Sequence, residues 1–240
     1  MIEELLASPL FIIVCITIVV FIIGMIIASS AHRRFMELAE QYSDTSTSLG
    51  LNTAEFLYRS IEMLGQEKTK LAMAGEKVAD CYDYINDTII LKEEHLQSYS
   101  ITSLAIASHE LGHSMQRHAN SFWLLLGFIF QKLNKFFQGL FLPLILIGLV
   151  VWLIPFEFSM VGEVLIYVGL GALAVSVLLK IVLIPLEFNA SKRAINFLKK
   201  HIPLDRQEIA VVKKLLNAAG NTYIASLFEK PYIIYRALFK

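Results

Sequence analysis

Three long runs with no charge or a single charge constrain what this chain can fold into more than any other feature. The first extends from Leu10 to Ala28 and the second from Phe136 to Phe156, and neither contains a charged residue. The third, from Val164 to Leu186, is interrupted only by Lys180. Each run is long enough to cross about 30 Å of hydrocarbon as a helix. Hydrophobic residues make up 56% of the 240 residues, so the sequence predicts a mainly α-helical membrane protein with three transmembrane helices.

The first run could instead be a secretory signal peptide. Such peptides begin with a basic segment, whereas this chain has Glu3 and Glu4 before the run and no lysine or arginine there. We therefore expect residues 1–30 to stay in place as a transmembrane anchor.

Lysine and arginine lie on one side of the three predicted spans. These residues are Arg33, Arg34, Lys132, Lys135, Lys192, Arg193, Lys199 and Lys200. The opposite flanks carry only Glu3, Glu4, Glu157 and Glu163. The positive-inside rule then predicts a multi-pass protein of the cell membrane with its N-terminus outside and residues 30–135 and 187–240 on the cytosolic side. The expected partner is the lipid bilayer, and a net charge of zero gives no indication of a nucleic-acid partner.

The first cytosolic segment shows one helix start and one strand. Asn52 followed by Glu55 is typical of a helix N-terminus, and Gly65 of a helix end. The residues from Thr88 to Leu91 follow the turn-prone pair Asn86-Asp87 and predict a strand. The sequence thus indicates a small α+β unit on this side of the membrane.

Helical spacing returns further along the chain. The pattern predicts a helix from about Thr102 to Asn120, with Ser100 or Thr102 as a possible cap. The apolar stretch from Phe122 to Phe130 is too short to cross a bilayer, and we interpret it as an interfacial continuation of that helix. Asp205 with Glu208 predicts the start of another helix, which we expect to end near Gly220.

The helix from Thr102 contains the motif His109-Glu110-Leu111-Gly112-His113. Histidines at positions i and i+4 project from one helix face, so both imidazoles can reach one zinc ion. Glu110 projects in another direction, where it can act as a general base toward a water that the metal activates. The motif has only three fixed letters, and a structural metal or a chance occurrence remain open alternatives.

A catalytic zinc needs a third protein ligand and an open fourth position. Glu187 is the first charged residue after the third run, on the side where the topology also places His109. We predict that Glu187 is the third ligand. The alternative is an interfacial carboxylate that faces lipid headgroups.

The motif and three further segments resemble the YugP-type neutral zinc metallopeptidases of bacterial membranes. The segments are HELGHSMQ (109–116), PLEFNASKRA (185–194), AAGNTYIAS (218–226) and DCYDYINDTIILKEE (80–94). The resemblance covers roughly residues 50–230. The resemblance implies a zinc-dependent peptidase with a protein or peptide substrate. It also implies His109, His113 and Glu187 as the zinc ligands and Glu110 as the general base.

Two residues depart from the usual family pattern. Asn189 stands where the family usually has aspartate, and Ser114 where it usually has alanine. An acid two residues after Glu187 could orient a metal-bound histidine, and losing such support typically costs about 10–100-fold in metal affinity or activity. Asparagine still accepts a hydrogen bond, so we expect this second-shell change to tune the site without inactivating it.

Substrate binding and oxyanion stabilisation have weaker candidates. We predict that Thr88, Ile89, Ile90 and Leu91 form an edge strand that pairs with an extended substrate. Tyr223, Arg193 and His118 are candidates for stabilising the oxyanion. Alternatively, Tyr223 serves packing, Arg193 contacts a lipid phosphate at the interface, and His118 is solvated.

The expected fold combines the three transmembrane helices with a cytosolic zincin-like α+β unit assembled from separated segments. We expect an anchor at residues 1–30, a zincin-like part at 31–135, a transmembrane hairpin at 136–186, and a helical part with the third ligand at 187–240. The predicted activity is zinc-dependent hydrolysis of membrane or membrane-proximal proteins. The alternative is an inactive membrane scaffold with a structural zinc. Transport would require ligands inside the spans, which carry few polar groups.

Overall fold

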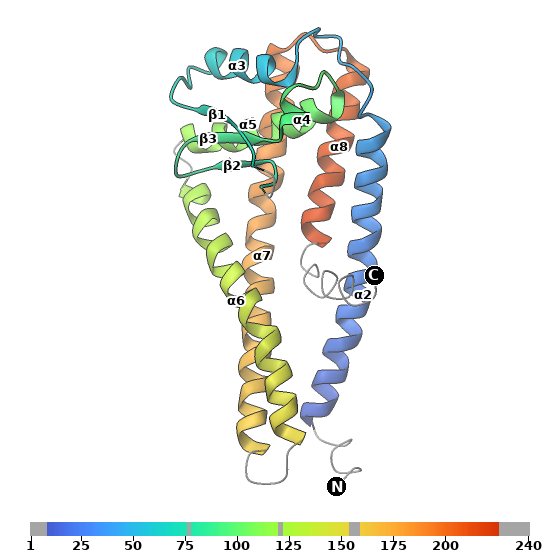
Figure 1. Ribbon diagram of the computed structural model, residues 1–240, viewed down its shortest axis with the longest axis vertical. Helices are drawn as coiled ribbons and strands as arrows, with labels where there is room; N and C mark the ends of the chain where they lie inside the picture. Colours follow the sequence, from blue (N-terminus) through green and yellow to red (C-terminus); the bar gives the residue numbers. More distant parts are fainter. Residues whose placement is uncertain (1–8, 76–77, 120–121, 154–158, 226–240) are drawn as a thin grey trace. The chain divides into compact units, whose positions relative to one another are not determined.

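The computed structural model describes residues 9–75, 78–119, 122–153 and 159–225 (Figure 1). Within them the chain is mainly helical with one three-stranded sheet, as the sequence predicts. Glu3, Glu4 and Glu157, which support the predicted orientation, lie outside the described residues. The elements are α2 (Pro9–Gln41), α3 (Thr53–Met63), β1 (Lys70–Met73), β2 (Cys81–Asp83), β3 (Thr88–Leu91), α4 (Glu93–Leu96), α5 (Ile101–His118), α6 (Phe122–Leu153), α7 (Ser159–His201) and α8 (Arg206–Ala225).

Three helices, α2, α6 and α7, are long and apolar enough to cross a membrane, which confirms the three predicted spans. One prediction about them is wrong. The stretch from Phe122 to Phe130 belongs to the same helix as the second span, because α6 begins at Phe122 and continues to Leu153. The apolar stretch alone is too short to cross a bilayer, but Gln131 and Lys132 after it are good helix formers and do not end the helix.

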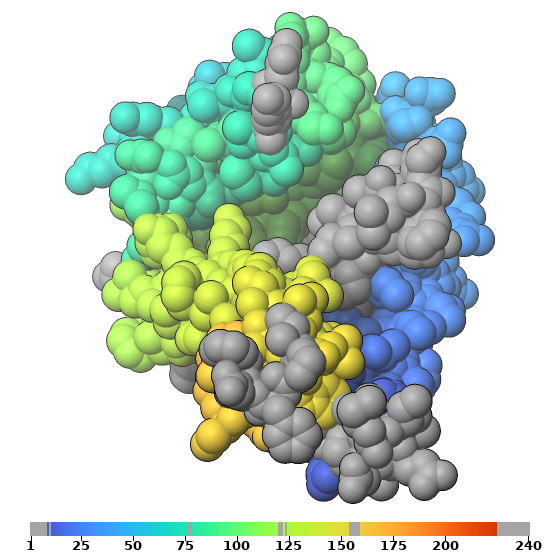
Figure 2. Space-filling model, turned by 60° about the horizontal axis from the view of Figure 1, so that its bottom comes forward, coloured from blue at the N-terminus to red at the C-terminus, as the bar shows by residue number. Residues whose placement is uncertain are grey.

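The chain divides into two compact units. The first comprises Met1–Ser30, Ile129–Leu183 and Tyr223–Lys240. In it, α6 and α7 pack as a hairpin around the fully buried Ile166. Their residues lie side by side in the space-filling view, where α6 is yellow and α7 orange (Figure 2). Glycines stand where the two backbones approach closely.

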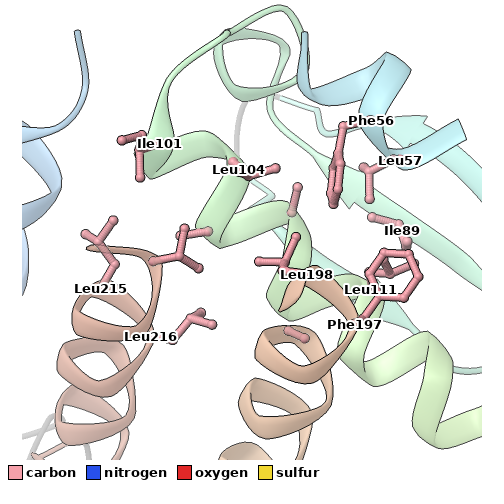
Figure 3. Packing of buried hydrophobic residues seen from close by; sticks show 14 of the residues in the cluster. Phe56, Leu57, Ile89, Ile101, Leu104, Leu111, Phe197, Leu198, Leu215 and Leu216 are labelled. Atoms are coloured by element: carbon pink, nitrogen blue, oxygen red, sulfur yellow. The ribbon is translucent and has the colours of Figure 1, made fainter. Parts of the chain in front are cut away.

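The second unit comprises Ala31–Phe128 and Ile184–Thr222 and contains the sheet and the motif helix α5. A single hydrophobic cluster holds it together, with side chains from α3, β3, α5, α7 and α8 (Figure 3). Phe56 and Leu57 of α3 pack here with Ile89 of β3, and Leu111 of α5 lies in the same cluster as Leu198 of α7. Burial of Leu111 fixes one face of α5 and leaves another for the polar residues of the motif.

The helix starts agree with the sequence. Asn52 and Glu55 form a capping box at α3, and Ser100 caps α5. Asp205 and Glu208 bond to each other's backbone N–H at the start of α8, at 2.7 and 2.9 Å. The prediction that α8 ends near Gly220 is wrong, because the helix continues to Ala225.

Gly220 lies inside α8 and serves packing instead of termination. A Cβ at this position would lie 2.9 Å from Cζ of Phe188, so the absence of a side chain lets the phenyl ring approach the helix. By contrast, Gly65 ends α3 with a φ of +64°, a conformation that favours glycine.

The strand from Thr88 to Leu91 exists, but the prediction that it forms a sheet edge is wrong. The strand order is β1-β3-β2, so β3 is the central strand. It pairs with β1 in parallel along its whole length and with β2 antiparallel. Since neighbours occupy both its sides, β3 cannot add a substrate strand. The outer strands are β1 and β2, and β2 packs on α5 together with β3.

Candidate metal centre

The two histidines of the motif project from the same face of α5, one turn apart. The ring centroids of His109 and His113 are 4.8 Å apart and the rings are nearly perpendicular. Both side chains are largely buried, with 21% and 12% of their surface exposed. This is the arrangement that the spacing of the motif predicts.

Glu187 of α7 approaches both histidines. Its Oε2 lies 3.3 Å from Nε2 of His109 and 3.5 Å from Nε2 of His113. Tetrahedral zinc with bonds of about 2.0–2.1 Å keeps its ligand atoms roughly 3.3 Å apart. One potential ligand atom from each of the three residues lies within 4.8 Å of the others, and this donor set fits a zinc ion.

The two helices can meet here because Gly112 has no side chain. A Cβ on Gly112 would overlap the carbonyl oxygen of Ala190 and lie 2.9 Å from its carbonyl carbon. Ala190 itself is fully buried. The glycine inside the motif therefore brings the backbone of α5 against that of α7. Gly112 directly precedes His113, and Ala190 lies one turn after Glu187.

Each histidine also has a hydrogen-bond partner at its second nitrogen. Nδ1 of His109 lies 3.1 Å from Oγ of Ser191, and Nδ1 of His113 lies 3.0 Å from Oε1 of Gln116. Both Nε2 atoms thus remain for the side that faces Glu187. Such support fixes the ring orientation of metal-binding histidines.

Burial and charge shift the protonation of the motif residues. Burial raises the pKa of Glu110, and the negative charges of Glu187 and Asp80 add to this, against the opposing effect of the two histidines. For His113 burial is the largest cause and favours the neutral ring, but the hydrogen bonds to Glu187 and Gln116 and the negative charges of Glu187 and Glu110 together outweigh it and raise the pKa to about 9. The cluster therefore favours a positive charge at its centre, which is the charge that a metal cation supplies.

The candidates for histidine support and oxyanion stabilisation lie in different surroundings. Asn189 does not bond to a histidine directly: its Oδ1 accepts from Nε2 of Gln116 at 3.0 Å and from Nε of Arg193 at 2.9 Å. His118 is directed elsewhere, with Nε2 3.1 Å from Oδ2 of Asp87. Oxyanion roles for Arg193 and for Tyr223, which lies in the other unit, stay predictions.

Sequence reasoning missed Gln116 and Ser191. Helical spacing could have found both, because Gln116 lies three residues after His113 and Ser191 four residues after Glu187. Residues at these offsets share a helix face, and both types can support a histidine.

Comparison with known proteins identifies the family of this chain. The model of the family described as "Putative neutral zinc metallopeptidase" matches residues 17–239. The chain belongs to this family. It is also 30% identical over 196 residues to the "Putative membrane protease YugP" of Bacillus subtilis (strain 168), a match that covers 79% of this chain and 82% of that protein. No solved structure matches the chain. The matches confirm the resemblance that the motifs carry.

Proposed function

We propose that this protein is an integral-membrane zinc metallopeptidase that hydrolyses membrane or membrane-proximal proteins. The observation that carries the proposal is the convergence of His109, His113 and Glu187, with one potential ligand atom from each within 4.8 Å of the others. Family membership supports the same activity. The three residues are ligands from two helices, and the fourth position is left for water and substrate.

The chain supplies the ligands and a base beside them. Zinc bound by these residues would lower the pKa of a water molecule to about 7 and polarise the scissile carbonyl. Glu110 would take the proton of the attacking water at its carboxylate and pass it to the leaving amine. Ser191 and Gln116 keep the histidine rings in place.

Substrates close to the bilayer are favoured by the order of the chain. Glu187 follows the third apolar run without an intervening linker, and both belong to the single helix α7. The distribution of lysine and arginine supports an active site on the cytosolic side. A single-cysteine variant at Lys200, made in a Cys15→Ser/Cys81→Ser background, should resist a membrane-impermeant maleimide in intact cells. Labelling comparable to that of a cysteine at Glu3 would contradict this orientation.

The test of function compares wild type with Glu110→Gln, both purified in detergent. We expect both to contain about one zinc per chain, and only wild type to cleave a panel of unfolded proteins and membrane-anchored peptides. An inactive scaffold with a structural zinc predicts metal in both and cleavage by neither. Equal cleavage by both variants would exclude Glu110 as the base.

A further inference from the structure

We propose that Gln116 is a positioning residue that fixes the tautomer and orientation of His113, and that Asn189 and Arg193 hold Gln116 in place. The proposal rests on the proposed zinc site. Four side chains form one continuous series of hydrogen bonds, from Arg193 through Asn189 and Gln116 to His113. None of the first three is a metal ligand.

The orientation of the Gln116 amide follows from its neighbours. One end of the amide lies 2.9 Å from the backbone carbonyl of Leu186, which can only accept a hydrogen bond. That end must be the NH2 group, and Oε1 must face His113. The second N–H of the same group donates to Oδ1 of Asn189 at 3.0 Å.

The orientation of the Asn189 amide is fixed in the same way. Nε of Arg193 can only donate, and it lies 2.9 Å from the atom of Asn189 that also faces the NH2 group of Gln116. Two donors require an oxygen between them, so Oδ1 stands there. The carbonyl of Leu186 and the guanidinium of Arg193 thus determine every hydrogen bond in the series.

The orientation of Gln116 determines which ring nitrogen of His113 carries the proton. Because Oε1 of Gln116 is an acceptor, Nδ1 of His113 must carry a proton and donate it across 3.0 Å. In the neutral ring the lone pair is then on Nε2, the atom that faces Glu187 at 3.5 Å. Gln116 is 1% exposed, so water cannot easily replace it.

His109 has a less restrictive partner. The hydroxyl of Ser191 can rotate and either donate or accept, so it orients the ring without dictating the tautomer. Both supports depend on α7, since Ser191, Leu186, Asn189 and Arg193 all belong to the turns around Glu187. The helix that provides the third ligand thus also orients the two histidines that α5 provides.

The test is zinc affinity of the full-length chain in detergent, measured by competition with a chelator. Gln116→Leu removes the acceptor at nearly constant volume, and we expect the zinc dissociation constant to rise about 10–100-fold. Gln66→Leu is the matched control, because Gln66 is also buried and bonds to α5, through Ser114, but touches no ligand. Its zinc affinity should stay within about twofold of wild type.

A double-mutant cycle separates this series from a general loss of packing. Asn189→Leu should weaken zinc binding in wild type but change it by less than about twofold when Gln116 is already leucine. Asn189→Leu leaves α5 unaltered, so it tests the series even where Gln116→Leu does not fold. An Asn189→Leu protein with wild-type affinity, or a folded Gln116→Leu protein with wild-type affinity, overturns the positioning role. Absence of zinc from wild type overturns the proposed function instead.

Discussion

The protein brings helices into backbone contact in two regions, and the contact has a different role in each. In the second unit, Gly112 of α5 meets the backbone of Ala190 in α7. In the first unit, Gly162 of α7 meets the backbone of Trp152 in α6, and Gly148 lies against Ile166. Both regions depend on a missing side chain. The contact between α5 and α7 is surrounded by histidine, glutamate, glutamine and serine side chains. The contact between α6 and α7 is surrounded by apolar residues.

The difference shows what close approach accomplishes in each place. Between α6 and α7 it allows tight packing where lipid would provide no hydrophobic driving force, as small residues commonly do in membrane helices. Between α5 and α7 it sets a distance, because the contact between Gly112 and Ala190 brings the two helices together where Glu187 lies 3.3 Å from His109 and 3.5 Å from His113. A similar steric change should therefore affect chemistry in one region and only stability in the other.

The largest effect is expected for Gly112→Val. The new side chain would overlap the backbone of Ala190, which cannot move aside as a flexible side chain can. We expect zinc content to fall to background and the thermal transition to broaden or disappear. Elemental analysis and a melting curve in detergent measure this. Gly139→Val in α6, where a Cβ would meet no atom within 4 Å, is the control. One zinc per chain in Gly112→Val would contradict the account of this contact.

Within the α5–α7 region, the Glu110→Gln variant distinguishes metal binding from proton transfer. Loss of a general base typically costs about 10²–10⁴-fold in rate, and we expect a decrease of that size with zinc content unchanged. The measurement pairs the rate of peptide cleavage with elemental analysis. Loss of zinc in this variant would assign Glu110 a part in metal binding.

The matching test of the first unit is Gly162→Ala. A Cβ there would lie 2.5 Å from the backbone nitrogen of Trp152, and overpacking of this kind costs about 1–3 kcal/mol. We expect a lower melting temperature in detergent but wild-type zinc content per folded chain. Gly171→Ala, with open space around its Cβ, should melt like wild type. Zinc loss in Gly162→Ala would show that the two regions are not independent.

The smallest effect is expected for Asn189→Asp. The carboxylate would accept from Gln116 and Arg193 as the amide does, and its charge would strengthen both hydrogen bonds. We expect zinc affinity to rise, by less than about 10-fold. Chelator competition measures the change. A weaker affinity would show that the amide of Asn189 is required as such.

Local signals in the sequence predicted most of what positions the site. Asn52 with Glu55 and Asp205 with Glu208 mark helix starts that the structure confirms, because capping acts between residues three apart. The spacing of His109 and His113 fixes their common face, because residues four apart project from the same side of a helix. The order of spans and charges along the sequence predicts Glu187 as the third ligand.

Features that depend on packing between distant segments were not predictable. The central place of β3 follows from its pairing with both β1 and β2, which no pattern within Thr88–Leu91 reveals. Gly220 looks like a helix end in the sequence, but the phenyl ring of Phe188 explains its presence inside α8. The part of Gln116 depends likewise on Leu186 and Asn189, far along the chain.

The central claim is that α5 and α7 together hold one metal ion. Its most direct test is the zinc content of the purified protein, for wild type and for Glu187→Ala, with Glu62→Ala at an exposed position of α3 as control. We predict about one zinc per chain in wild type and control, and a sharp decrease in Glu187→Ala, because two histidines alone leave the cation without its carboxylate. Zinc retained in full by Glu187→Ala would contradict the claim.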